Sequence, residues 1–122
     1  MTIGHFAKVS NITADTLRYY EKINLLRRVH RDKAGRRTFL PEDLNWIGFI
    51  KRLKDTGMPL AEIRKYADLR EKGTSTLKAR QQLLKKHARV LMDRMEADRN
   101  NLQKLKEKIA FYRRELTRRK TS

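Results

Sequence analysis

The sequence predicts a mostly α-helical fold, in which a small globular unit with one β-hairpin precedes a long helix that pairs with another helix. Three observations support this prediction. A capped, basic helix follows a tight turn near the N-terminus, turn-forming residues separate two short basic segments, and apolar residues repeat in heptads towards the C-terminus. We expect a globular domain over residues 1–72, a coiled-coil dimerisation helix over 76–118 and a basic tail over 119–122, with no effector domain.

Two short helices are expected at the start of the chain. The first spans Ile3–Ser10, and Asn11 can adopt the left-handed backbone that a tight turn often needs. Thr13 is a favourable N-cap for the second helix, and Asp15 lies in its first turn, where the helix dipole stabilises an acid. This spacing is typical of a helix-turn-helix, whose second helix lies in the major groove of DNA.

A basic hairpin is expected after these two helices. Residues 27–37 include six Lys or Arg residues and a single acid. Val29–Arg31 and Arg37–Phe39 can each form a short strand, and Asp32–Gly35 between them has turn chemistry. The hairpin would be a wing beside the two helices, so the sequence predicts a winged helix-turn-helix.

Two further helices complete the expected core. Pro41 begins the third helix and Gly57 ends it, while Pro59 precedes a fourth helix that Gly73 ends. Apolar residues at helical spacing in the four helices predict the buried face. This face comprises Ile3, Phe6, Ala7, Val9, Ile12, Leu17, Tyr20, Leu44, Ile47, Ile50, Leu53, Leu60, Ile63, Tyr66, Ala67 and Leu69, with Trp46 and Phe49 at its margin.

The C-terminal segment has the pattern of a coiled coil. From residue 76 to residue 116 there is no Gly or Pro, and apolar residues alternate at steps of three and four. A lone helix would leave this stripe in water, so we expect a homodimer. The expected dimerisation residues are Leu84, Ala88, Leu91, Met95, Asp98, Leu102, Leu105, Ile109 and Tyr112.

One polar residue, Asp98, lies in the middle of this apolar seam. A buried polar residue there would cost stability but fix the register of the pair. Alternatively, Asp98 lies at the edge of the coil and is solvated. In an antiparallel pair it could lie close to Arg89, Arg94 or Arg99 of the second copy.

Charge and composition narrow the function. A net charge of +17 and a pI near 10.7 favour a polyanionic partner, because Lys and Arg displace counterions from phosphates. The absence of cysteine excludes disulfides and thiolate metal sites, and the histidines have no metal-ligand spacing. No catalytic set of residues is present, so we expect no cofactor and no enzyme activity. No segment resembles a membrane span or a signal peptide, so a cytoplasmic location is expected.

The second helix carries most of the expected DNA contacts. Arg18 can bind guanine O6 and N7 or a phosphate. Thr13 and Asp15 either contact DNA or act only as cap and helix-dipole residues. Tyr19 is expected to be exposed and Tyr20 to lie mostly in the core. The whole expected set is Thr13, Ala14, Asp15, Thr16, Arg18, Tyr19, Tyr20, Arg36, Arg37, Arg64 and Lys65.

The basic residues of this set outside the second helix are expected to reach the DNA backbone. Arg36 and Arg37 would touch phosphates or a minor groove, unless the hairpin is simply solvated. Arg64 and Lys65 lie on the fourth helix, whose N-terminus can also hold a phosphate.

Several short segments occur in a specific order along the chain. They are Ile3-Gly4 and Phe6-Ala7, Thr16–Glu21 with Leu25-Leu26, Gly35–Arg37 before Phe39, Asp43-Leu44 with Ile47, and Lys54–Met58 before Leu60 and Glu62-Ile63. With the long terminal helix, they resemble the MerR family of bacterial transcription regulators over nearly the whole chain. The small branch that responds to aldehyde and thiol stress is the most similar.

The resemblance implies a winged helix-turn-helix that dimerises through an antiparallel coiled coil and binds a palindromic promoter operator. It further implies that the protein bends and untwists the DNA, so that RNA polymerase can engage both promoter elements. The cysteines that sense metals or electrophiles in the family are absent here, the latter around Lys51–Leu53, so no signal is identified. The alternatives are an architectural or nucleoid-type DNA-binding protein, and an adaptor whose basic long helix binds an acidic partner or RNA.

Overall fold

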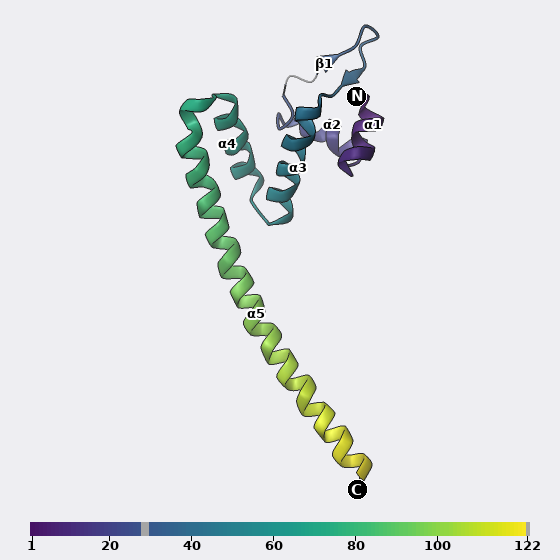
Figure 1. The fold of residues 1–122 in the computed structure, drawn as a ribbon, viewed down its shortest axis with the longest axis vertical. Helices are drawn as coiled ribbons and strands as arrows, with labels where there is room; N and C mark the ends of the chain where they lie inside the picture. Colours follow the sequence, from purple (N-terminus) through teal and green to yellow (C-terminus); the bar gives the residue numbers. More distant parts are fainter. Residues whose placement is uncertain (28–29, 122) are drawn as a thin grey trace. The chain divides into compact units, whose positions relative to one another are not determined.

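The computed structural model describes residues 1–27 and 30–121 (Figure 1). Its elements are α1 (Ile3–Ser10), α2 (Ala14–Lys22), β1 (His30–Arg31), β2 (Arg37–Thr38), α3 (Pro41–Asp55), α4 (Leu60–Glu71), a 3-10 turn (Thr74–Thr76) and α5 (Leu77–Thr121). The mostly α-helical prediction is confirmed, including the hairpin and the long last helix. Val29, expected at the start of the first strand, lies outside the described residues. The chain forms one compact unit over Met1–Leu83, and the rest of α5 forms a second.

The turn between α1 and α2 is built from the local chemistry that the sequence predicts. Thr2 caps α1, because its hydroxyl accepts the N–H of His5 at 3.2 Å. Asn11 ends α1 with a φ of 59°, in the left-handed region that asparagine tolerates. Thr13 then caps α2 by accepting the N–H of Thr16 at 3.1 Å. Residues of the helix-turn-helix itself therefore end α1 and begin α2.

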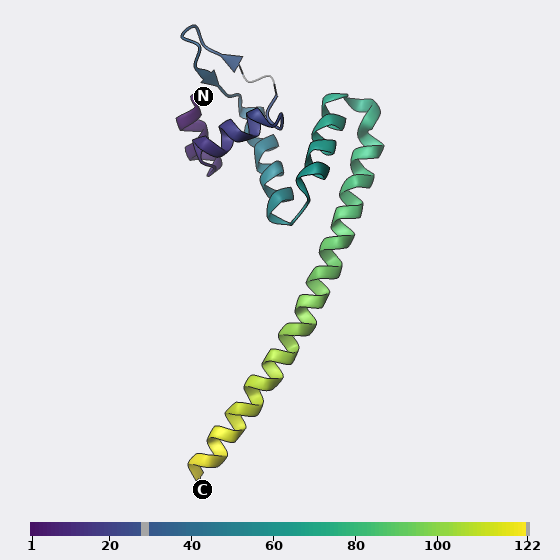
Figure 2. The same ribbon diagram turned by 180° about the vertical axis from the view of Figure 1, so that it is seen from behind.

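The core of the first unit lies where α1, α2, α3 and the hairpin meet. Phe6 is fully buried and its ring stacks on that of Phe39, with 4.5 Å between the ring centroids. Ile47 and Ile50 of α3 are also fully buried. In both views α3 runs on to a turn, from which α4 returns beside it (Figure 1 and Figure 2).

Two residues expected in the core are exposed instead. Val9 is 49% exposed, because the eight-residue α1 packs through the face of Phe6 and Val9 lies to one side of that face. Leu60 is 41% exposed, because it is the first residue of α4 and lines a hollow at the surface. Leu44, Tyr66 and Leu69 are only partly buried.

The N-terminus extends the wing, which the sequence does not predict. The Met1 amino group donates to the carbonyl of Phe39 at 2.8 Å, and the Phe39 N–H donates back to the Met1 carbonyl at 2.7 Å. Thr2 pairs with Thr38 as an isolated antiparallel bridge. The first residues therefore add a third, very short strand to the β1–β2 hairpin and join it to α1.

Trp46 joins α3, α4 and the segment after α2. Its indole N–H donates to the carbonyl of Leu25 at 2.8 Å, which satisfies a polar group inside the core. The ring of Tyr66 stacks on it, and the Arg70 guanidinium lies 4.2 Å from its ring centre. Trp46 is thus buried by polar as well as apolar contacts.

The burial of apolar residues changes along the long helix α5. Its first turns belong to the first unit, where Leu83 is buried. Beyond Leu84, the apolar residues of the heptad pattern are widely exposed in the single chain, including Leu105 at 62% and Ile109 at 58%.

Replacing Phe6 tests the packing of α1 on the wing. We expect Phe6→Ala to lower the free energy of unfolding by about 3–5 kcal/mol, because it leaves a cavity under Phe39. Val9→Ala, three residues along the same helix, should cost less than about 1 kcal/mol because Val9 is exposed. Urea denaturation followed by circular dichroism measures both. Equal losses for the two variants would contradict this packing.

Candidate nucleic-acid interface

Helix α2 presents one buried face and one exposed face. Leu17 and Tyr20 are buried, which turns Asp15, Arg18 and Tyr19 towards solvent. Ala14 and Thr16 are partly buried, whereas Thr13, at the N-cap, is exposed. All seven predicted contact residues of this segment therefore lie in α2 or at its N-cap. Besides the N-cap residue, five of them are at least partly accessible to solvent.

The two charged residues of this face are paired with each other. Arg18 donates from Nη1 to Oδ1 of Asp15 at 2.9 Å, one helical turn away. The Asp15 side chain is 95% exposed and that of Arg18 is 48% exposed. The pair therefore lies at the surface, where an ion pair contributes little to stability.

The adjacent tyrosines differ as the sequence predicts. Tyr19 is 48% exposed, whereas Tyr20 is 3% exposed. The Lys54 ammonium lies 5.8 Å from the centre of the Tyr20 ring, which fixes that ring against α3. Tyr19 is thus the tyrosine whose ring and hydroxyl are available to a ligand.

The tip of the wing is organised by one carboxylate. Asp32 accepts the backbone N–H groups of Ala34 and Arg36, each at 2.9 Å, and the Arg36 Nε at 3.2 Å. The Arg36 backbone N–H is the largest cause that holds the pKa of Asp32 below its usual value. The charged form therefore persists, and its contribution to the turn is lost only as the pH falls through this lowered pKa. The Arg36 side chain stays 77% exposed.

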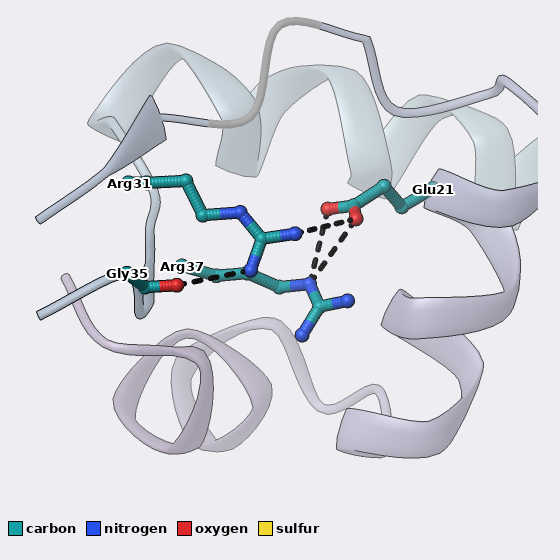
Figure 3. Close-up of polar contacts among 4 residues, drawn as sticks. All are labelled: Glu21, Arg31, Gly35 and Arg37. Atoms are coloured by element: carbon teal, nitrogen blue, oxygen red, sulfur yellow. Dashed lines mark hydrogen bonds and ion pairs between the residues drawn. The ribbon is translucent and has the colours of Figure 1, made fainter.

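Glu21, near the end of α2, ties both strands of the wing to the helix (Figure 3). Its carboxylate accepts the Nε of Arg37 at 3.1 and 3.2 Å and the Nη2 of Arg31 at 3.3 Å. Arg31 and Arg37 are paired across the hairpin, where two like charges repel. Arg31 also donates to the carbonyl of Gly35 at 3.2 Å. One acid thus offsets the repulsion of two arginines and fixes the wing against α2.

This arrangement separates the two predicted wing arginines. Arg37 is partly buried, with its side chain 26% exposed and its Nε held by Glu21. Arg36 points from the tip and is the more accessible of the two. The sequence predicts that Glu21 lies in the second helix but does not predict its contact with the wing. An acid near a helix C-terminus is disfavoured by the helix dipole, and this unfavourable position could have indicated that Glu21 has a basic partner elsewhere.

On α4, Arg64 and Lys65 are both exposed. Arg64 borders an open hollow of about 320 Å³ that Lys22, Asn24 and Arg27 also line. Arg27 forms an ion pair with Asp68, which ties the segment after α2 to α4. The structure thus brings Arg64 together with Lys22 at the end of α2 and with Arg27 after it. Lys65 does not border this hollow.

Two kinds of site are absent from the described residues, a metal site and a membrane span. Within residues 1–27 and 30–121, no group of His, Asp and Glu side chains gathers as a metal site. No helix among these residues is both long enough and apolar enough to cross a membrane.

Comparison with known families agrees with this architecture. Residues 1–70 match the family described as MerR HTH family regulatory protein, and residues 44–112 match the family described as MerR, DNA binding. The chain belongs to the MerR family. The resemblance found in the sequence is confirmed, and the relatives are transcription regulators rather than enzymes, as expected.

Individual MerR relatives match most of the chain. It is 34% identical to an HTH-type transcriptional regulator of Haemophilus influenzae, over 91% of this chain and 82% of the relative. It is 38% identical to AdhR of Bacillus subtilis, over 69% of this chain and 60% of AdhR. The crystal structure of HiNmlR, a MerR family regulator lacking the sensor domain and bound to promoter DNA, has a TM-score of 0.82 at 34% identity, covering 93% of this chain and 86% of that one. A Listeria monocytogenes structure reaches 0.87 at 37% identity, covering 92% and 85%.

The contact of Glu21 with the MerR wing can be tested by stability. We expect Glu21→Gln to lower the free energy of unfolding by about 1 kcal/mol, because two arginines lose their shared partner. Asp55→Asn, which removes the exposed Lys51–Asp55 pair, is the matched control and should cost less than about 0.5 kcal/mol. Urea denaturation at low and high salt measures both variants. A Glu21→Gln loss no larger than that of the control would show that the wing is held by other contacts.

Proposed function

We propose that this protein is a dimeric, sequence-specific transcription regulator that binds a promoter operator through α2 and its wing. The observation that carries the proposal is the exposed face of α2, with Arg18 and Tyr19, held by Glu21 against a basic hairpin. Family membership supports it, and one relative of matching fold is described as bound to promoter DNA.

In this proposal the residues of α2 divide between base and backbone contacts. Arg18 has the reach and the forked donors to bind a guanine edge, with Ala14 and Asp15 on the same leading turn. Thr13, Thr16 and Tyr19 carry hydroxyls that can donate to phosphates, and these contacts would fix the position of the helix. The buried Tyr20 acts mainly by holding α2 on the core, with its hydroxyl as the part that could approach the DNA backbone.

The remaining cations would contact the DNA backbone. Arg36 at the exposed wing tip is the stronger candidate for contact with a phosphate or a minor groove. Arg37 would contact a DNA phosphate while its Nε stays bonded to Glu21. Arg64 and Lys65 lie in the second turn of α4, next to the first turn, whose backbone N–H groups and helix dipole also attract phosphate. Affinity should therefore fall steeply with salt.

Two copies would pair through the apolar seam of α5. The exposed residues of this seam in the single chain support a partner, and a two-fold pair would recognise a palindromic operator. By its resemblance to the family, the dimer would bend and untwist the promoter so that RNA polymerase engages both of its elements. Nothing among the relatives favours the architectural or the adaptor alternative.

Arg18 gives the direct test of the recognition helix. We expect Arg18→Ala to weaken binding to the operator upstream of the regulated gene by about 1–3 kcal/mol, because a bidentate base contact is lost. Arg89→Ala removes the same charge from α5 and should change affinity less than threefold, about 0.6 kcal/mol. Footprinting locates the operator, and gel-shift titration measures both variants. Protection spread evenly over unrelated DNA, or equal affinities for the two variants, would contradict sequence-specific binding by α2.

The dimer is tested by placing a charge in the seam. Leu105→Lys should weaken self-association at least tenfold, because Leu105 would be buried between the helices. Val90→Lys adds the same charge at an exposed position outside the seam and should have little effect. Sedimentation equilibrium measures both. A wild-type protein that stays a folded monomer at micromolar concentration would rule out pairing through α5.

A further inference from the structure

One edge of the apolar seam of α5 carries cations and no acid. Along this edge, every seventh residue is basic except for a single methionine. We call this edge the basic flank, and it comprises Lys78, Lys85, Met92, Arg99, Lys106 and Arg113. All five of its cations are exposed. The acids Asp93, Glu96 and Glu107 lie instead on the side of the helix away from the seam.

The opposite edge of the seam is mixed in charge and polarity. It comprises Arg80, His87, Arg94, Asn101, Lys108 and Glu115. Because it contains both a polar residue and an acid, its members can form some favourable contacts with a second copy. The basic flank contains no acid and so has no such contact with itself.

Symmetry decides which edges meet in a pair of α5 helices. In an antiparallel two-fold pair, the same edge of both helices lies on the same side of the interface. The basic flank of one copy then faces the basic flank of the other, whatever the register. Such a pair gathers cations along one side of its own interface, spaced by about 10 Å along each helix.

One antiparallel register covers the whole seam. This register places Met95 beside Asp98 of the second copy, and the two-fold axis of the pair passes midway between positions 95 and 98. Every other seam residue then also has a partner. These layers pair Leu77 with Leu116, Gln81 with Tyr112, Leu84 with Ile109, Ala88 with Leu105, and Leu91 with Leu102.

The same register sets the contacts of the basic flank. Lys78 faces Arg113 of the second copy, Lys85 faces its Lys106, and Met92 faces its Arg99. On the opposite edge, Arg80 faces Glu115, which is attractive. The repulsion is therefore confined to one side of the pair, where an anion could bridge the facing cations.

We propose that α5 pairs with a second copy in this register, and that the paired basic flanks bind phosphate groups that strengthen the pairing. The inference rests on the proposed dimer and adds to it a register and a ligand chemistry. Phosphate fits because Lys and Arg donate charge-assisted hydrogen bonds to its oxygens. Self-association then tightens as phosphate is added, whereas DNA binding by the wing and α2 weakens with salt.

The first experiment separates phosphate binding from simple screening. Sedimentation equilibrium of the full chain gives the dimer dissociation constant in NaCl and in sodium pyrophosphate at the same ionic strength, and with an unrelated DNA duplex. We expect pyrophosphate, the duplex or both to tighten pairing about tenfold beyond NaCl. An effect of pyrophosphate identifies free phosphate as a source. An effect of the duplex alone identifies the DNA backbone as the source only if Lys85→Glu removes that effect, because DNA bound through the two wings also favours the dimer. Pairing that follows ionic strength alone would overturn the proposed site.

Charge reversal on the basic flank tests the site and the register together. Lys85→Glu and Lys106→Glu should each tighten pairing about tenfold at low salt, because a Glu then faces a Lys. Each should also reduce the response to phosphate. The double variant Lys85→Glu/Lys106→Glu should return towards the wild-type constant, because Glu then faces Glu. Additive effects of the two changes would overturn the register.

Lys86→Glu is the matched control, since it makes the same charge change one residue away and outside the flank. It should alter pairing less than threefold and leave the phosphate response intact. An effect equal to that of Lys85→Glu would mean that net charge alone governs pairing and would overturn the inference. A protein that is monomeric in every condition would instead refute the proposed dimer, so the two failures are distinguishable.

Discussion

The contact between Glu21 and the two wing arginines is the constraint on which the candidate interface depends. Without an acid between them, Arg31 and Arg37 would face each other across the hairpin as like charges. With it, the wing is joined to the end of the helix that carries Arg18 and Tyr19. The carboxylate is partly buried, so solvent screens these contacts less than it screens the exposed pairs elsewhere on the surface. Helix and hairpin are therefore presented as one surface.

The features that the sequence predicts well are those that depend on near neighbours. The caps at Thr13 and Asn11 follow from side-chain chemistry within three or four residues, and the structure shows both. The contrast between Tyr19 and Tyr20 follows from helical geometry alone. The hairpin turn at Asp32 and the heptads of α5 are local patterns of the same kind. These elements account for the fold class and for most of the candidate site.

The features that the sequence does not predict depend on residues far apart in the chain. The pairing of Met1 with Phe39, the bond from Trp46 to Leu25, and the ties from Glu21 to the wing all join segments separated by ten or more residues. Burial of Val9 and Leu60 was expected from helical spacing, but spacing does not say where a neighbouring element ends. Only the packed structure shows which side of a short helix is covered.

The ion pair between Asp15 and Arg18 has a consequence for selectivity. An arginine that is already satisfied by a carboxylate gains little by exchanging it for an ordinary phosphate, because one oxyanion replaces another. A guanine edge in the correct position offers two aligned acceptors, and a nearby cytosine amino group could occupy Asp15 at the same time. Because the pair is exposed and therefore weak, Asp15 would bias Arg18 only modestly against a phosphate contact made without a base contact. Specificity would then depend on weaker binding to other DNA sequences as well as on stronger binding to the operator.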